Sequence, residues 1–293
     1  PNSAPTPHAY PAINLVIYDL RTKKRLWLFE RHKSDQLSVS DHEFTLGRHT
    51  LARDKDRLCA TIDGHQAPIA RRMQAALSLD FSTVFEKHYA LDSLRDHHWY
   101  PVAPLARATV TISSPKKITF TGKAYHDCNY GNRPLSDSFS NWWWMQSRDA
   151  NNSRSQVQYN CQGPHARGRR SWTFSSDGSV VEEKNRREVR RATQELVRPD
   201  YRFGLKQRFW RQKSIALPAG VESNAHVVPL ETSPFYQRSL IKLGSAHARN
   251  PNVRVTGSRA IGDQFAIHEY LDFTALQKPW VRRLIPFRLT TPR

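Results

Sequence analysis

The sequence predicts an all-β protein, and three observations support this fold class. Its apolar runs are short, alternate with polar residues and are rich in β-branched and aromatic side chains. Polar turn signals separate these runs, and few segments repeat apolar residues with a helical period. Many short strands between turns are typical of an antiparallel sandwich or barrel, and not of alternating strands and helices.

Each expected strand rests on its own run. Residues 13–20 and 25–30 alternate on either side of the polar turn 21–24, which predicts two neighbouring strands. The same reasoning predicts strands at residues 44–46, 58–62, 77–81, 108–112, 118–120, 142–146, 156–159, 172–174, 208–210, 214–217, 226–230, 238–243, 253–257 and 265–271. The SSDG sequence at residues 175–178 is typical of a hairpin turn.

Two segments favour helices, residues 92–96 and residues 274–285, and Pro279 interrupts the second. The charged segment 180–200 fits either a short helix or an exposed loop. A chain of 293 residues can form two domains, and the turn at Asn132, Arg133 and Pro134 favours a boundary nearby. We therefore expect one β domain over residues 1–135 and a second over residues 136–293.

The basic composition limits the classes of partner. The chain has 45 Lys and Arg against 26 Asp and Glu, a formal charge of +19, which attracts nucleic acid, anionic lipid or an acidic protein. We find no zinc-finger, RNA-binding or basic-zipper motif, so a nucleic-acid partner is disfavoured. An anionic membrane surface fits better if the ligand is a lipid.

Other classes of protein are also disfavoured. No apolar run approaches the about 20 residues that a membrane-spanning helix needs. The three cysteines, Cys59, Cys128 and Cys161, are far apart, which favours a reducing compartment over a disulfide scaffold. No zinc-site spacing, phosphate loop or dinucleotide fingerprint occurs, so we expect neither a metal ion nor an organic cofactor.

The densest chemistry lies between Gly122 and Gly131, where the sequence reads GKAYHDCNYG. On a strand Tyr125, Asp127 and Asn129 share one face, because successive side chains alternate. Burial in an apolar pocket would raise the pKa of Asp127 and keep a proton available for transfer. The competing interpretation is that Asp127 caps a turn, and the sequence leaves both open.

Two further clusters contain aromatic rings beside titratable groups. In RDHHWYPVAP, residues 95–104, His97 and His98 point to opposite faces of a strand, and one of them can equally be a core histidine. The run Trp142, Trp143 and Trp144 follows, with two rings on one face and the third on the other. Secondary acid–base candidates, or simply surface groups, are Glu231, His268 and Glu269.

Several ordered blocks together resemble the carotenoid 1,2-hydratase family, also called hydroxyneurosporene synthases. They are INLVIYD, FER at residues 29–31, HHWYPVAPLARATV, the block at residues 122–131, FSNWWWMQSR, LETSPFYQRS, AIHEYLDF and KPWVRRLIPFR. The resemblance implies two lipocalin-like antiparallel β domains. It also implies addition of water to the terminal C1–C2 double bond of an acyclic carotenoid such as lycopene or neurosporene, giving a tertiary alcohol without metal or cofactor. Family members carry a strand before INLVIYD, so we expect the first domain to lack its first strands.

The resemblance also implies site residues. The family's H-x-W motif falls on His97 and Trp99, and its Y-x-D motif on Tyr125 and Asp127. Asp127 would protonate C2, Trp99 and Tyr125 would shield the cation at C1, and His97 would orient Asp127 or take a proton from water. Substrate contacts are expected from aromatic residues of the same blocks, namely Tyr100, Phe139, Trp142, Trp144, Phe235 and Tyr236.

Three alternatives remain open at the level of sequence. A cofactor-free polyene or terpenoid cyclase or isomerase would begin with the same protonation but exclude water from the cation. A non-catalytic lipid-binding lipocalin would bind without turnover, and a nucleic-acid binder would use the basic surface. For a hydratase, the apolar substrate predicts a cytoplasmic protein bound peripherally to the cytoplasmic membrane, in reach of other carotenoid-biosynthesis enzymes and released by high salt.

Overall fold

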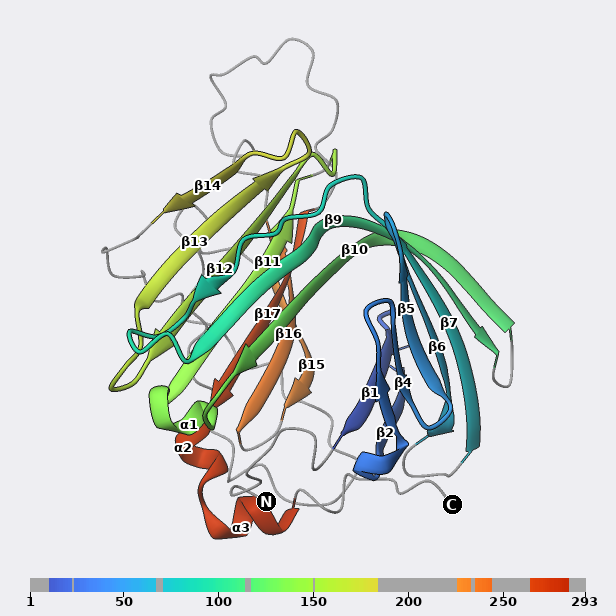
Figure 1. The fold of residues 1–293 in the computed structure, drawn as a ribbon, viewed down its shortest axis with the longest axis horizontal. Coiled ribbons are helices and arrows are strands. Elements are labelled where there is room, and N and C mark those ends of the chain that lie inside the picture. Colours follow the sequence, from blue (N-terminus) through green and yellow to red (C-terminus); the bar gives the residue numbers. More distant parts are fainter. Residues whose placement is uncertain are drawn as a thin grey trace. The chain divides into compact units, whose positions relative to one another are not determined.

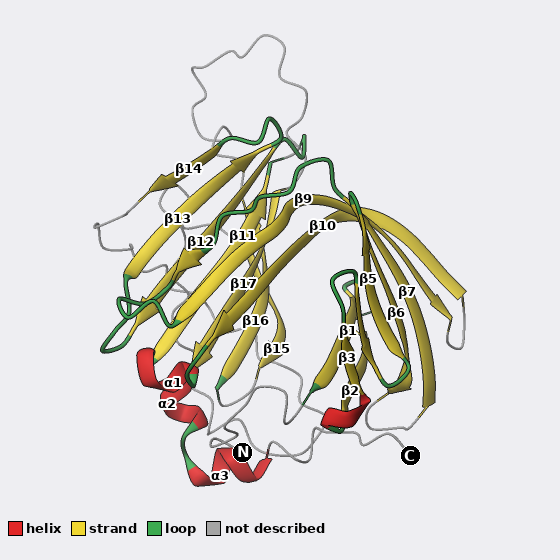
Figure 2. Cartoon of the chain, viewed as in Figure 1, coloured by secondary structure: helices red, strands yellow, loops and turns green. Residues whose placement is uncertain are grey.

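The computed structural model describes residues 11–22, 24–66, 71–113, 117–149, 151–183, 226–232, 235–243 and 264–284. These residues form mainly β-strands, with a few short helices (Figures 1 and 2). Every strand pairing with a described register is antiparallel. The predicted all-β class is therefore confirmed. Within the described residues, no helix combines the length and apolarity needed to cross a membrane.

The first sheet has ten strands. Its strands are β1 (Ala12–Asp19), β2 (Lys24–Arg31), β3 (Leu37–Val39), β4 (Glu43–Leu46), β5 (His49–Asp54), β6 (Arg57–Gln66), β7 (Arg71–Asp80), β8 (Tyr89–Ala90), β9 (His97–Ser113) and β10 (Lys117–Gly131). The main order is β10-β9-β7-β6-β5-β4-β3. Strand β2 pairs with both β1 and β6, and β8 pairs with β9. A short 3₁₀ turn, η2 (Ser34–Gln36), precedes β3.

The second sheet has seven strands in the order β14-β13-β12-β11-β17-β16-β15. Its strands are β11 (Asn141–Arg148), β12 (Arg154–Gln162), β13 (Gly168–Ser175), β14 (Val180–Glu183), β15 (His226–Thr232), β16 (Tyr236–Leu243) and β17 (Gln264–Asp272). The helices are α1 (Leu135–Ser138), α2 (Phe273–Leu276) and α3 (Pro279–Leu284). Alternation along β12 buries every second side chain, from Ser155 to Cys161, as expected for a sheet with one packed face.

The chain forms two compact units. Unit 1 comprises Pro1–Lys87, Tyr100–Cys128 and Pro279–Arg293, and unit 2 comprises His88–Trp99 and Asn129–Lys278. The two long strands β9 and β10 contribute residues to both units. The first unit changes to the second at residues 128–129, and residues 88–99 belong to the second unit.

Each unit has its own apolar core. In unit 1, Leu28, Met73 and Ile112 are buried together, and Leu58, Phe81, Ala103 and Ala106 form a further cluster. In unit 2, aromatic rings from β8, β9, β12 and β13 pack together as the core. The apolar alternation of the first hairpin is thus satisfied, because Leu15 and Leu28 face each other across β1 and β2.

Most of the expected strands and helices in the described residues are present, but the helix expected at residues 92–96 is absent. The SSDG turn joins β13 to β14, with Gly178 at φ +87°. Helices α2 and α3 replace the expected helix 274–285, and Pro279 is the first residue of α3. Residues 92–96 are not helical, because Asp92 accepts a hydrogen bond from the Asp96 N–H in a turn that Arg95 completes at φ +61°. The strands expected at 208–210, 214–217 and 253–257, and most of segment 180–200, lie outside the described residues.

Candidate functional site

Tyr125 and Asp127 lie on one face of β10 in unit 1. The Tyr125 hydroxyl donates a hydrogen bond of 2.8 Å to Oδ2 of Asp127. Both side chains are half-buried. The Tyr125 hydroxyl thus fixes the position of Oδ2. The pair can therefore present a fixed acid, which is the geometry that proton transfer to a substrate requires.

His126 points to the other face of β10, as strand alternation predicts. Burial lowers its pKa, and the nearby positive charge of Arg53 lowers it further. His126 is therefore neutral at physiological pH.

His97 opens β9 in unit 2 and is buried. Its Nδ1 lies 2.6 Å from Oδ2 of Asp92, and its Nε2 lies 2.9 Å from the carbonyl oxygen of Arg133. Both ring nitrogens therefore face groups that accept hydrogen bonds. A Cβ on Gly131 would come within 2.7 Å of the His97 ring, so the glycine permits this close packing. His97 is thus fixed at both ring nitrogens within unit 2.

Asp92 is the centre of this buried network. Its carboxylate accepts hydrogen bonds from His97, from the Ser138 hydroxyl at 2.8 Å and from the Asp96 N–H at 3.0 Å. Burial by itself raises the pKa of Asp92, but these hydrogen bonds outweigh it and the net pKa is lowered. The Asp92 carbonyl also accepts from Nε of Arg167 at 2.6 Å. The network joins the start of β9 to α1 and to the turn before β13.

Trp99 lies at the centre of the aromatic core of unit 2 and is fully buried. The centroids of four rings lie 4.7–6.0 Å from its own, namely those of Tyr89, Tyr159, Trp172 and Phe174. The Arg170 guanidinium covers the Trp172 ring at 4.8 Å and forms an ion pair with Glu182. Trp99 is therefore the central ring of this aromatic core.

The three consecutive tryptophans of β11 alternate as predicted. Trp142 packs against Phe139, Tyr159 and Phe273. Trp143 faces the opposite side, where its ring lies 6.2 Å from that of His268. Of the expected substrate contacts, Phe139 and Trp142 are buried in the core. The half-buried ones, which keep surface for a ligand, are Tyr100 in unit 1 and Trp144, Phe235 and Tyr236 in unit 2.

The secondary acid–base candidates differ in their surroundings. Glu269 is held in an ion pair with Arg238, whose Nη2 lies 2.6 Å from Oε1. His268 is completely buried, and burial lowers its pKa to about 4. In the described part of the chain neither ring nitrogen of His268 has a hydrogen-bond partner. His268 is therefore a neutral imidazole in an apolar environment.

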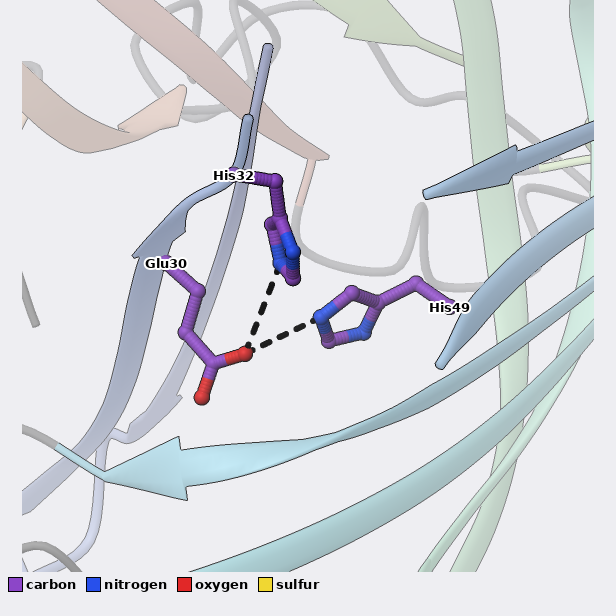
Figure 3. Close-up of side chains that lie close together, drawn as sticks. All are labelled: Glu30, His32 and His49. Carbon is purple, nitrogen blue, oxygen red and sulfur yellow. Dashed lines mark hydrogen bonds and ion pairs between the residues drawn. The ribbon is translucent and has the colours of Figure 1, made fainter. Parts of the chain in front are cut away.

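Unit 1 contains a further cluster of titratable side chains that was not predicted from the sequence, namely Glu30, His32 and His49 (Figure 3). Among the described residues it is the only set of three or more His, Cys, Asp or Glu side chains placed to hold a metal ion. The spacing Glu30-x-His32 puts two of these side chains on one side of a strand and could have drawn attention to them. His49 lies seventeen residues further, so no local motif connects it to the other two.

Residues 2–293 match the protein family described as carotenoid hydratase CrtC. Three curated relatives are similar to the chain, and each is named acyclic carotenoid 1,2-hydratase. The Thiocapsa roseopersicina protein is 26% identical over 97% of this chain, the Rubrivivax gelatinosus protein 28% over 81%, and the Rhodobacter capsulatus protein 25% over 97%. The chain spans 63% and 54% of the length of the first two and 89% of the third.

Among solved structures, the chain is similar to that of a candidate AttH protein from Nitrosomonas europaea. The TM-score is 0.57 at 11% identity, and the match covers 89% of this chain and 81% of the other. At this identity the likeness concerns the fold alone. It supports the lipocalin-like all-β fold class expected from the sequence.

Proposed function

Because the chain belongs to the carotenoid hydratase CrtC family, we propose that it adds water to the terminal C1–C2 double bond of an acyclic carotenoid, such as lycopene or neurosporene. The family match over residues 2–293 and the three relatives support the reaction class. The observation that carries the chemistry is the hydrogen bond between Tyr125 and Asp127. It provides a positioned carboxylic acid beside an aromatic ring.

The reaction begins with proton transfer. Asp127 in its neutral form transfers its carboxyl proton to C2 of the alkene, and the π electrons form the new C–H bond. This leaves a tertiary cation at C1 and a carboxylate at Asp127. Water attacks C1, and the proton that it then loses returns to the carboxylate. The acid is regenerated, and the net change is the addition of one water without redox chemistry.

Tyr125 has two functions in this proposal. Its hydroxyl orients the carboxyl group through the hydrogen bond to Oδ2. Its ring stabilises the cation, since a desolvated cation over an aromatic face gains about 2 kcal/mol or more. Trp99 has a supporting function in this proposal, because it packs against four other buried rings and so stabilises the core of unit 2.

For His97 we propose a positioning function. Both of its nitrogens already face acceptors within the protein, so neither is placed to receive a proton from water. It fixes the start of β9, two residues before Trp99. A substitution of His97 would then lower activity through the placement of β9 and not through loss of a base.

The membrane supplies the substrate in this proposal. An acyclic carotenoid is too apolar to be free in water, and a formal charge of +19 favours an anionic lipid surface. We expect the protein to bind anionic vesicles, to be released by high salt and to receive its substrate there, in reach of other carotenoid-modifying enzymes. Binding to anionic vesicles that persists at molar salt would contradict this electrostatic attachment.

The deciding experiment is incubation of the full chain with lycopene in water labelled with heavy oxygen, followed by mass spectrometry of the extract. Gain of one labelled water at one or both ends supports hydration. An unchanged mass with altered retention would show a cyclase or isomerase. Bound pigment without any product would show a lipid-binding protein, and either outcome would refute the proposal.

A further inference from the structure

The cluster of Glu30, His32 and His49 lies at a gap in the first sheet. One edge of β6 pairs with β7 along its whole length. The other edge pairs with β5 at residues 57–61 and with β2 only at Gln66, opposite Leu28. Between these two ladders the backbone of β6 needs other partners. Two side chains provide them, because the His65 N–H donates to Oε1 of Glu30 at 2.7 Å and the Asp63 N–H donates to Nδ1 of His49 at 3.4 Å.

These contacts explain Glu30 and His49 but not His32. The His32 side chain is only 4% exposed, and in the described part of the chain neither ring nitrogen has a hydrogen-bond partner. Buried polar groups in native proteins are nearly always satisfied, so such a ring requires an explanation, and an ion is one of the usual ones. Its Nε2 points at Oε2 of Glu30 from 3.7 Å, beyond hydrogen-bonding distance (Figure 3).

The spacing of the three ligand atoms fits a small transition-metal ion. Tetrahedral zinc with bonds of about 2.1 Å places neighbouring ligand atoms about 3.4 Å apart. Nε2 of His49 lies 3.1 Å from Oε2 of Glu30, and Nε2 of His32 lies 3.7 Å from the same oxygen. The three ligand atoms all lie within 4.8 Å of one another. Two imidazoles and one carboxylate are a ligand set that zinc accepts.

Two glycines allow the ligands to approach. A Cβ on Gly47, which has φ +59° in the hairpin between β4 and β5, would lie 2.8 Å from Nδ1 and Cε1 of His32. A Cβ on Gly64 would lie 2.7 Å from Oε1 of Glu30. Any larger residue at either position would therefore displace one of the three ligands.

We propose that Glu30, His32 and His49 bind one divalent transition-metal ion of the zinc type. Without the ion, Nδ1 of His49 accepts from Asp63, so Nε2 carries the hydrogen that faces Glu30. Metal binding needs the lone pair of Nε2, so the single proton of the neutral ring moves to Nδ1, and the 3.4 Å hydrogen bond from the Asp63 N–H is lost. The ion connects the end of β2 to the start of β5 across the gap along β6. It stabilises unit 1 and takes no part in the hydration.

The test is a titration of the full chain, stripped with a chelator and dialysed, with Co²⁺ and then Zn²⁺. We expect one equivalent of Co²⁺ to give the intense visible absorption of a four-coordinate site, and Zn²⁺ to displace it. His32→Gln is expected to weaken this site by about 100-fold or more, because one of three protein ligands is lost. The matched control is His42→Gln, which removes an exposed histidine one residue before β4 and should leave the site unchanged.

His32 makes no hydrogen bond in the described residues, so His32→Gln is expected to fold. If the buried amide prevents folding, His32→Leu removes the same ligand with an apolar side chain. The proposal is overturned if the parent chain shows no saturable site for either ion. It is equally overturned if a folded His32 variant binds Co²⁺ with the affinity and spectrum of the parent.

Discussion

Replacement of Asp92 by asparagine is the sharpest test of the network that holds His97. Asp92 is fully buried and accepts hydrogen bonds from His97, Ser138 and the backbone of Asp96. Asparagine has nearly the same shape, but it carries no charge and presents an NH₂ group in place of one acceptor oxygen. Asp92→Asn therefore removes the carboxylate that faces the His97 ring, and its NH₂ group meets another hydrogen-bond donor in place of an acceptor.

The magnitude follows from this burial. Removing one partner of a buried ion pair costs about 3–5 kcal/mol, because the other charge is left uncompensated. We expect the free energy of unfolding of Asp92→Asn to fall by about 3 kcal/mol or more at pH 7. The pH dependence has a defined sign. Since the folded pKa of Asp92 is lowered, its stabilisation is present above the unfolded pKa of about 3.9 and is lost as the pH falls through the folded value.

The assay is urea unfolding followed by tryptophan fluorescence, which reports on the packing of Trp99 and Trp172 in unit 2. The control is Asp80→Asn, which removes an exposed ion pair with Arg57 and should leave the midpoint unchanged. A loss below about 1 kcal/mol for Asp92→Asn would refute the buried ion pair. In that case the contact between His97 and Asp92 would not be an ion pair.

Three other variants test the remaining contacts. Burial lowers the pKa of His268 to about 4, below its unfolded value of about 6.5, so the free energy of unfolding should fall as the pH decreases between these values. His268→Leu should make that decrease smaller in acid-titrated denaturation curves, and an unchanged decrease would contradict this assignment. Tyr125→Phe removes the hydrogen bond to Asp127 and should lower kcat about 10–100-fold without changing the melting temperature. An unchanged kcat would show that Tyr125 has no function in the reaction. Trp99→Ala should cost about 3–5 kcal/mol of stability in chemical unfolding, and a loss below about 1 kcal/mol would contradict its central position.

Local alternation made several features predictable from the sequence. The two-residue period of a strand placed Tyr125 and Asp127 on one face, and their hydrogen bond confirms it. The same period separated Trp142 from Trp143, and their contacts on opposite faces of β11 agree. The SSDG sequence predicted a hairpin turn, and in the structure Gly178 has the positive φ that the turn requires.

Features that depend on distant contacts were not predictable. The segment 92–96 looked helical, yet its turn is fixed by Asp92, whose partner Ser138 lies 46 residues away. The contacts of His97 with Asp92 and with the carbonyl oxygen of Arg133 were not predictable from its H-x-W motif. The cluster of Glu30, His32 and His49 forms only because β2 and β5 both pair with the same edge of β6, and no local sequence pattern predicts that pairing.

The most direct test of the proposed chemistry is turnover of acyclic carotenoid by Asp127→Asn, measured beside pigment binding. Asparagine preserves the shape of the side chain and can still accept the Tyr125 hydrogen bond, but it has no proton to transfer. We predict parental carotenoid binding with hydration lowered by a factor of about 100–10,000, while the exposed-pair control Asp80→Asn keeps full activity. Hydration by Asp127→Asn at the parental rate would contradict the assignment of Asp127 as the acid.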